Sequence, residues 1–418
     1  MKQKMKKRRV VMNKFIIIVF AGLFTNIYAY SQDKSRFVEY KEGFYENSIL
    51  KDIRAVDGQK KRENTFRYFS YDFAGKEFPT DTNLYSRVKY NPSVSQGNTG
   101  TCWCFAATSF MESEAMRLNH VAVKISEMYT VYWEYIERAK DFVKTRGETY
   151  FEQGSEANAI PKIWKEYGIV PKSVYEGKRG EGKFYDHSKL IVELKNYLKG
   201  IEESSAWNER KVIEGVQSIL DDYMGTPPKK FTYKGKNYTP KTFLKDYLNL
   251  RMNDYFSFMS TMSVPFMEMH ELVEPDNWWH SRNYYNLSVN DYYELIQKTI
   301  KDGYSICICG DVSEAGYSSF DEVGIVPDFD IPSEAINDYS RQFRLSNGTT
   351  TDDHCIHLVG IYESDNGTWF MIKDSGSGGF NGKNKGYRFV NEDYIRLKMM
   401  NILIHRTPAT PILDKIIK

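Results

Sequence analysis

The stretch from Gln96 to Phe110, QGNTGTCWCFAATSF, places two cysteines on either side of a tryptophan, directly after a turn that contains glycine. Residues 102–119 contain no glycine or proline, and their apolar side chains recur every three to four positions, which predicts a helix beginning at Cys102. Unpaired backbone N–H groups at a helix start stabilise negative charge and lower the pKa of a thiol there. Cys102 is therefore the candidate nucleophile, whereas Cys104 lies on another helix face and is expected to be packed.

The residues before Cys102 suit the stabilisation of an oxyanion. Gly97 and Gly100 let the backbone pass close to a substrate carbonyl, because they carry no Cβ. Gln96 supplies a side-chain amide that would donate to the oxyanion together with the backbone N–H of Cys102.

A base must come from elsewhere in the chain. Among seven histidines, His354 stands in DDHCIHLVGIY, where a polar segment turns into a hydrophobic strand. His357 is the rival, but it lies three residues on and faces the other side of a strand, so it is expected in the core. Asp374, in WFMIKDSGSGG at the end of the next strand, is the candidate that orients the imidazole, since a hairpin brings a strand's start near its partner's end.

The order of these motifs, Q-x5-C-W-x-F, then H-x5-G, then W-x3-K-D-S, resembles the papain-like cysteine peptidases. The resemblance implies that Gln96 binds the oxyanion, that Cys102 is the nucleophile and that His354, with Gly360 six residues after it, is the base. Asp374 stands where that family has asparagine, and DSGSGG replaces the family's NSWG, so the aromatic cover of the histidine pair is missing. An aspartate still accepts the imidazole N–H and stabilises imidazolium more strongly.

His354 lies 252 residues after Cys102, whereas papain-type enzymes space the two by about 130–150 residues, so roughly a hundred residues are inserted. This insertion, and the phrases YGIVPKSVYEG and IKDGYSICICGDV, resemble the bleomycin hydrolase and aminopeptidase C branch. The branch implies an α+β papain-like fold, with a helical subdomain, an antiparallel barrel-like subdomain and a helical hook. It also implies a hexamer, and a C-terminal arm whose carboxylate engages the substrate amine; no residue of RTPATPILDKIIK identifies such an arm.

The sequence divides into six expected segments. They are a signal peptide (1–31), an N-terminal arm (32–80), a helical subdomain with the nucleophile (81–175), a hook-like insertion (176–290), a β-rich subdomain with the histidine (291–405) and a C-terminal tail (406–418).

The N-terminus predicts export to the periplasm or the extracellular space. Seven basic residues and no acid precede or flank an apolar run at 15–29, which is shorter than the roughly 20 residues that a membrane span needs. Met12 is an alternative initiator, and cleavage after Ala29 or Ser31 fits equally. Removing residues 1–31 removes seven positive charges and takes the net charge from +2 to −5, and no basic patch suggests a nucleic-acid partner.

The five cysteines are few and odd in number for an exported chain. Cys307 and Cys309 alternate on a strand-like run and are interpreted as small core residues, not as part of a disulfide framework. A zinc site built from Cys102, Cys104, His354 and His357 is disfavoured, because a helical C-x-C points its thiols apart.

Together these features predict thiol-dependent hydrolysis of peptide bonds through an acyl-enzyme, without cofactor or metal, and an aminopeptidase in particular. A papain-type endopeptidase and a catalytically impaired binding protein remain alternatives. Asp352 and Asp353 are expected in a solvated loop, with a carboxylate near a substrate amine left open.

Overall fold

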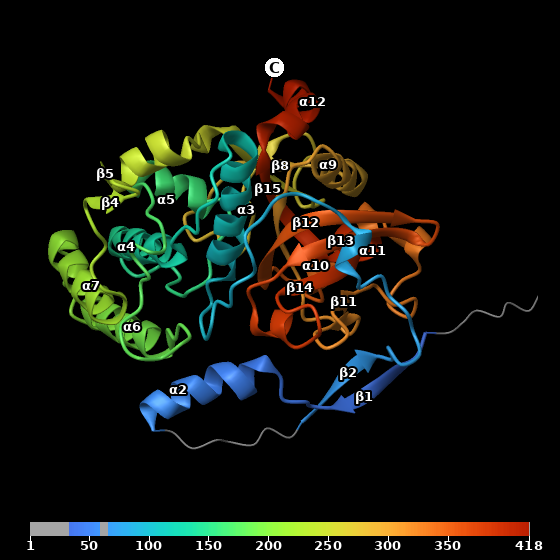
Figure 1. Cartoon of the computed structure of the whole chain (residues 1–418), viewed down its shortest axis with the longest axis horizontal. Helices are drawn as coiled ribbons and strands as arrows, with labels where there is room; N and C mark the ends of the chain where they lie inside the picture. Colours follow the sequence, from blue (N-terminus) through green and yellow to red (C-terminus); the bar gives the residue numbers. More distant parts are fainter. Residues whose placement is uncertain (1–32, 59–65, 418) are drawn as a thin grey trace, which may run out of the picture.

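Helix α3 (Cys102–Asn119) runs through the middle of the computed structural model, which describes residues 33–58 and 66–417. Figure 1 shows helices α4 to α7 on one side of α3 and the large sheet on the other. Residues 103–115 are all buried, as expected for a helix packed on both sides. The predicted helix is confirmed, and its start at Cys102 places the candidate nucleophile between the two halves.

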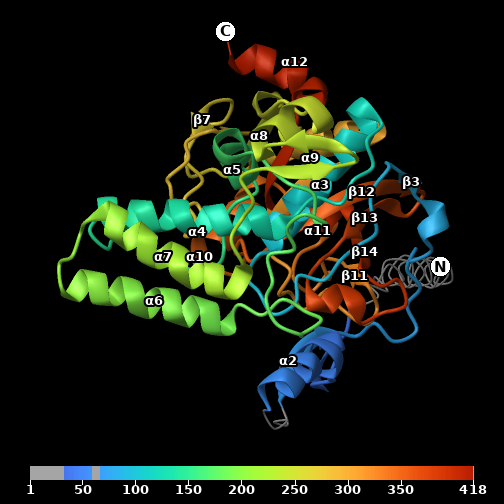
Figure 2. The same ribbon diagram turned by 60° about the vertical axis from the view of Figure 1, so that its left-hand side comes forward.

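The helical half is built on α4 (Glu127–Lys144), which packs against α7 (Glu209–Met224), while α7 also packs against α6 (Ser188–Glu203) (Figure 2). The side chain of Ser126 accepts the N–H of Tyr129 and caps α4, a role for which serine is favoured. The sequence predicts helices over 124–145, 156–168 and 188–201, and the observed helices at 127–144, 159–167 and 188–203 confirm them with ends shifted by at most three residues. The remaining elements of this half are α5 (Ala159–Tyr167), β4 (Phe231–Tyr233), β5 (Lys236–Tyr238), α8 (Pro240–Thr242), η3 (Phe243–Leu248) and η4 (Met252–Asp254).

The other half is a mixed, mostly antiparallel sheet whose strands run in the order β10-β11-β14-β13-β12-β9-β15-β6-β8-β7, with β3 beside β12. The strands of this sheet are β3 (Ser86–Arg87), β6 (Tyr255–Met259), β7 (Met269–His270), β8 (Tyr284–Asn286), β9 (Ile306–Gly310), β10 (Tyr317–Ser318), β11 (Val323–Gly324), β12 (His354–Ser364), β13 (Gly367–Lys373), β14 (Tyr387–Asn391) and β15 (Met399–His405). The strands expected around Cys307 and Cys309, from His354 onward and directly before Asp374 are confirmed as β9, β12 and β13.

Two hydrophobic layers hold the sheet in place. One face of β12 and β9 contacts α3, and the other contacts α9 (Val289–Lys301). Phe110 on α3 and Phe370 on β13 are fully buried in these layers, and each contributes about 1.5–3 kcal/mol to the free energy of folding. Short helices complete this half: η5 (Ser333–Ala335), α10 (Asp338–Asn347), η6 (Ser377–Phe380) and α11 (Glu392–Lys398).

The segment expected to be a separate insertion, 176–290, is in part built into the sheet. Its helices and the β4–β5 hairpin belong to the helical half, but β6, β7 and β8 are strands of the main sheet. The expected boundary at residue 291 therefore differs from the structure, because strand pairing across distant segments decides sheet membership.

The N-terminal arm lies against both halves at the end where α3 begins (Figure 1). Strands β1 (Ser35–Glu39) and β2 (Arg67–Tyr71) form an antiparallel pair, and η1 (Tyr45–Ile49) continues into α2 (Leu50–Asp57). The backbone N–H of Phe44 donates to Asn381 from the sheet half, and Asp52 accepts from the backbone of Lys183 in the helical half. The arm therefore spans the boundary between the two halves.

The C-terminal helix α12 (Arg406–Ile416) lies at the opposite end of the molecule (Figure 1). Tyr304 stacks on His405, directly before α12, and also lies against Arg117 near the end of α3. Arg117 is fifteen residues from Cys102, or about 22 Å along a helix. The described C-terminal segment is thus remote from the start of α3, in contrast to the cleft-bound arm that the family resemblance implies.

The predicted signal peptide lies outside the described residues. Within 33–58 and 66–417, no helix combines the length and the apolar character that crossing a membrane requires.

Candidate active site

The turn before α3 is fixed by the close approach of two chain segments. Gly97 has a φ of +70°, and a Cβ there would lie 2.3 Å from the carbonyl oxygen of Tyr185, so only glycine fits without a shift. The backbone N–H of Asn98 donates to that same carbonyl at 2.8 Å. Cys102 follows as the first residue of α3, half-buried and with a free thiol.

The structure brings His354 and Asp374 into contact. His354 opens β12 and Asp374 directly follows β13, and these strands pair antiparallel. Nε2 of His354 lies 2.8 Å from Oδ1 of Asp374. The sequence predicts this contact, because a hairpin brings the start of one strand near the end of the next. The contact uses Nε2 and leaves the other ring nitrogen of His354 available to the nucleophile.

A third charge, Arg388 on β14, completes the group. Its Nε lies 3.0 Å from Oδ2 of Asp374, and the backbone N–H of Gly376 donates to Oδ1 of Asp374 at 2.8 Å. Arg388 is itself buried, and its guanidinium also donates to the carbonyl of Ser318 and lies over the ring of Tyr317. Both carboxylate oxygens of Asp374 therefore have a cationic or N–H partner.

These contacts separate the pKa values of the pair. Burial alone would raise the pKa of Asp374, but the charge and hydrogen bond of His354 and the charge of Arg388 hold it well below its usual range. Burial alone would lower the pKa of His354, but the charges of Asp374 and Cys102, and hydrogen bonds with both, raise it well above its usual value. The arrangement favours a protonated His354 beside Cys102. A neighbouring imidazolium stabilises a thiolate, which is the nucleophilic form of cysteine.

Gln96 is anchored to the same turn as Asp374. Its Oε1 accepts the hydroxyl of Ser375 at 2.8 Å, and its Nε2 donates to the carbonyl of Thr99 at 2.7 Å. A side-chain amide has two N–H donors, so one remains for an oxyanion. Gln96, His354 and Asp374 line one cavity of about 620 Å³.

The N-terminal arm forms the outer wall of this cavity. The arm residues that line it are Tyr40, Lys41, Gly43, Tyr45, Glu46, Phe66, Tyr68 and Ser70. The hydroxyl of Tyr45 donates to Asn98, in the turn that precedes the candidate nucleophile. The arm therefore shapes access to the histidine instead of only covering the core.

The two rejected candidates are packed in the interior. Cys104 is fully buried, its Sγ lies 3.2 Å from the carbonyl oxygen of Glu127, and burial raises the pKa of its thiol well above the usual value. His357 is fully buried as well, with its Nδ1 2.8 Å from Oγ of Ser109. Burial, followed by the charge of Lys373, lowers the pKa of His357 well below its usual value, so it stays neutral.

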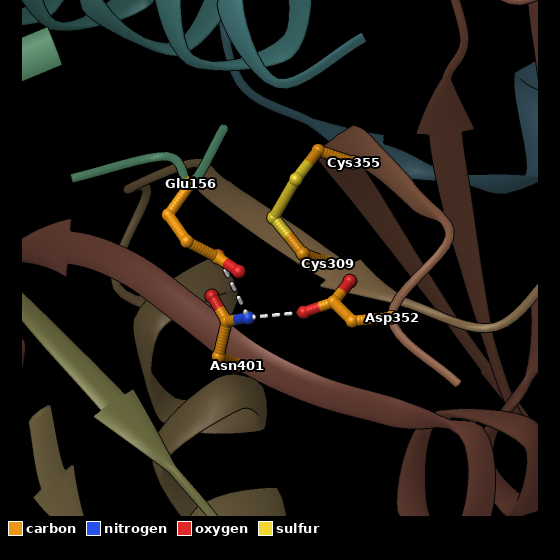
Figure 3. The surroundings of a disulfide bond; sticks show 5 residues. All are labelled: Glu156, Cys309, Asp352, Cys355 and Asn401. Carbon is orange, nitrogen blue, oxygen red and sulfur yellow. Dashed lines mark hydrogen bonds between the residues drawn. A yellow bond between two sulfur atoms is a disulfide. The ribbon is translucent and has the colours of Figure 1, made fainter. Parts of the chain in front are cut away.

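The interpretation of Cys309 as a simple core residue is wrong. Cys309 and Cys355 form a disulfide between β9 and β12, beside Glu156, Asp352 and Asn401 (Figure 3). These two cysteines are direct partners in the β9–β12 register, which brings their side chains together on one face. Cys307 remains a free, buried thiol, as expected.

Sequence reasoning missed Arg388 and the neighbourhood of Asp352. An aspartate in place of asparagine beside a buried histidine was itself a signal, because a buried carboxylate needs a counter-charge. Asp352 was expected in a solvated loop, but it is half-buried and accepts a hydrogen bond from Asn401 at 2.7 Å. Nothing in the local sequence marks Asn401, which stands inside an apolar strand.

Comparisons with known proteins agree with this geometry. A model of the Peptidase C1-like family matches residues 74–414. Aminopeptidase C of Lactobacillus delbrueckii subsp. lactis is 23% identical over 379 residues, covering 76% of this chain and 82% of that protein. Aminopeptidase C of Streptococcus thermophilus is 24% identical over 392 residues, covering 83% of each chain.

The fold has a solved counterpart. The crystal structure of PepW from Lactobacillus rhamnosis superposes with a TM-score of 0.66 at 20% identity, covering 81% of this chain and 85% of that one. The α+β fold expected from the resemblance is thereby confirmed. The match to the family model and the Aminopeptidase C relatives confirm the resemblance itself.

Proposed function

Since the chain belongs to the Peptidase C1-like family, we propose that it hydrolyses peptide bonds with Cys102 as nucleophile and His354 as acid and base. The observation that carries this proposal is the contact of His354 with Asp374 at 2.8 Å, together with the influence of Cys102 on the pKa of the same imidazole. A base oriented by a third group and hydrogen-bonded to a nucleophile is the arrangement that covalent hydrolysis requires.

In the proposed reaction the Cys102 thiolate attacks the scissile carbonyl. The backbone N–H of Cys102 and the free N–H of Gln96 Nε2 donate to the oxyanion. The His354 imidazolium gives its proton to the leaving amine as the C–N bond breaks, which leaves a thioester on Cys102. Water then loses a proton to His354 and attacks the thioester, which releases the carboxylic acid and restores the thiolate–imidazolium pair.

We propose further that the enzyme is an aminopeptidase, which removes residues from free N-termini. Support comes from the Aminopeptidase C relatives, which this chain matches over most of their length. A papain-type endopeptidase and an impaired binding protein, the alternatives open from the sequence, have no comparable support.

The test uses the mature protein with a thiol reductant on matched fluorogenic peptides that carry free or acetylated N-termini. Cys102→Ala is expected to reduce turnover to background, whereas Cys104→Ala, which alters a packed residue, keeps most of it. Hydrolysis restricted to free amines would establish an aminopeptidase, and hydrolysis of both peptides an endopeptidase. Equal loss of activity in the two cysteine variants would contradict the assignment of the nucleophile.

We also propose that the protein is exported. Support comes from the basic and apolar composition of residues 1–31 and from the Cys309–Cys355 disulfide, since such bonds persist in oxidising compartments. Cell fractionation and N-terminal sequencing of the full-length chain test this proposal, and an intact N-terminus in the cytoplasm would contradict it.

A further inference from the structure

Four carboxylates gather where the two halves of the molecule meet near Cys102. Glu156 precedes α5, Glu274 and Asp276 lie between β7 and β8, and Asp352 precedes β12; we refer to these four as the acidic cluster. Burial, and then the charges of Asp276 and Glu274, raise the pKa of Glu156 to about 8. Burial, and then the charge of Glu156, raise the pKa of Asp352 well above its usual value. The four groups therefore lie close enough to repel one another.

Asn401 links the two halves of the cluster (Figure 3). Its Nδ2 donates to Oδ2 of Asp352 at 2.7 Å and to Oε2 of Glu156 at 3.2 Å. Glu156 is 1% exposed, whereas Asp352 is half-buried. Asn401 is neutral, so it satisfies hydrogen bonds without cancelling charge.

No cation of residues 33–58 and 66–417 forms an ion pair with any member of the acidic cluster. Arg138 is the cation that acts on Asp276, but its guanidinium donates to the carbonyls of Glu152 and Gly154. Neighbouring buried carboxylates without a counter-charge are unfavourable, and a bound cation would relieve that cost.

A second and independent feature points to a ligand at the same place. Tyr284 is 1% exposed, and its hydroxyl makes no hydrogen bond of normal length to a described residue, although the side chain of Asn158 is near enough to lower its pKa. Burial and then the charges of Glu156 and Asp352 raise that pKa well above the usual value, so the hydroxyl lies near those carboxylates. The sheet register agrees, because Ser257 pairs with both Tyr284 and Leu403, which puts Tyr284 on the face that carries Asn401.

A neighbouring acceptor is unsatisfied too. Oδ1 of Asn158, two residues after Glu156, is buried without a partner among the described residues. A buried polar group without a hydrogen-bond partner is unfavourable, so these groups are expected to gain partners when a donor binds. A primary ammonium has three N–H donors and no acceptor, which fits a set of carboxylate, amide and hydroxyl oxygens.

The acidic cluster is also adjacent to the chemistry. Asp352 stands two residues before His354, and the charge of Cys102 contributes to the raised pKa of Asp352. Among the described residues, no group of three or more histidine, cysteine, aspartate and glutamate side chains is arranged to hold a metal ion.

We propose that Asp352 and Glu156, held together by Asn401, bind the α-ammonium group of the residue whose carbonyl Cys102 attacks. This inference rests on the proposed peptidase function and identifies the residues that select a free N-terminus. The shared chemistry is a primary ammonium, which a lysine side chain one residue further along a blocked peptide also carries. The experiment separates these two sources.

The kinetic test compares wild type with Asp352→Asn and Glu156→Gln, which keep an oxygen for the Asn401 amide. Asp365→Asn, in the exposed β12–β13 turn, is the matched control for loss of one charge. The substrates are the coumarin amides of alanine, acetyl-alanine and acetyl-lysyl-alanine. On the alanine amide, Asp352→Asn and Glu156→Gln are expected to lose at least tenfold in kcat/KM, mainly through KM. Asp365→Asn should change kcat/KM on the alanine amide less than twofold. On the acetyl-alanine amide, Asp352→Asn and Glu156→Gln should change kcat/KM less than twofold.

Unchanged selectivity in Asp352→Asn and Glu156→Gln, with an active wild type, would overturn this inference and leave the proposed function intact. If kcat/KM falls only on the acetyl-lysyl-alanine amide, the bound ammonium is that of a lysine side chain, and the assignment of the α-ammonium group is wrong.

A binding measurement needs no turnover and so separates this inference from the proposed function. Alaninamide at millimolar concentration is expected to raise the Tm of Cys102→Ala, whereas N-acetylalaninamide should not. Adding Asp352→Asn or Glu156→Gln should abolish the shift, and adding Asp365→Asn should preserve it. The absence of any difference between the two amides would overturn the inference, even if peptidase activity were established.

Discussion

Two groups of charged residues lie close to Cys102, and they are built in opposite ways. Around His354, every charge has a partner: Asp374 contacts both the imidazole and the guanidinium of Arg388. In the acidic cluster, Glu156 and Asp352 share only the neutral amide of Asn401. The first group is electrostatically complete in the free protein, and the second is not.

The difference indicates what each group is for. A charged group that must work on every substrate gains from fixed partners, because preorganised dipoles need no rearrangement during the reaction. A group without a counter-charge is stabilised when a ligand brings one, and it can therefore discriminate between charged and neutral ligands. The two groups are therefore expected to respond oppositely to the loss of a charge.

The largest effect is expected from Arg388→Met. This change leaves Asp374 buried with a carboxylate oxygen that has lost its cation, and breaking a buried pair in this way costs about 3–5 kcal/mol. Chemical denaturation at pH 6 should show a free energy of unfolding lower by that amount. Glu156→Gln, which changes a carboxyl group that has no cationic partner and is protonated in the folded protein at this pH, should show no loss under the same conditions.

The double variant Asp374→Asn/Arg388→Met checks the cause of this effect. It removes both charges and restores the asparagine of related peptidases, so it should recover most of the stability that Arg388→Met loses. A double variant as unstable as Arg388→Met would mean that Arg388 acts through packing on Tyr317 and not through the charge of Asp374.

A smaller effect is expected from the pH dependence of Glu156→Gln. The pKa of Glu156 is raised to about 8 in the folded protein, against about 4.3 for an unperturbed glutamate. Between these values the folded state holds a proton that the unfolded state has released, so the contribution of Glu156 to stability falls as pH rises. Glu156→Gln lacks this loss, and its Tm relative to wild type should increase from pH 5 to pH 8.

A difference in Tm that stays constant over this range would show that Glu156 has an ordinary pKa, and it would remove the contrast between the two charged groups. Asp365→Asn serves as the control, because an exposed carboxylate should give a constant difference.

The sequence predicted those features that are encoded within short windows. The helix at 102–119 and the strand at 354–364 followed from periodicity, and the pairing of His354 with Asp374 followed from the order of two adjacent strands. The role of Arg388 could not be predicted in this way. It lies opposite Ile372 across β13 and β14, two residues from Asp374, and that register is fixed only when the sheet forms.

The same reason applies to the disulfide and to the acidic cluster. Cys309 and Cys355 are 46 residues apart and meet only because β9 pairs with β12. Glu156 and Asn401 come from opposite halves of the molecule and are 245 residues apart. No local sequence pattern identifies such pairs. The odd number of cysteines indicated only that at least one of them is unpaired within the chain, and the aspartate in place of asparagine indicated only that its charge needs a partner elsewhere in the chain.

The smallest effect is expected from Asp374→Asn alone. Asparagine offers an oxygen to Nε2 of His354, as aspartate does at 2.8 Å, so the orientation of the imidazole is retained and kcat/KM on the alanine amide should stay within about tenfold of wild type. Loss of the carboxylate removes a charge that raises the pKa of His354, so the alkaline limb of the pH–rate profile should move to lower pH. Arg388 then remains buried without its anion, which predicts a loss of stability although activity is largely kept. A fall of activity to background in a variant that is still folded would show that the Asp374 carboxylate does more than orient the histidine. It would also contradict the interpretation that Asp374, with its charge balanced by its partners, is equivalent to a neutral asparagine.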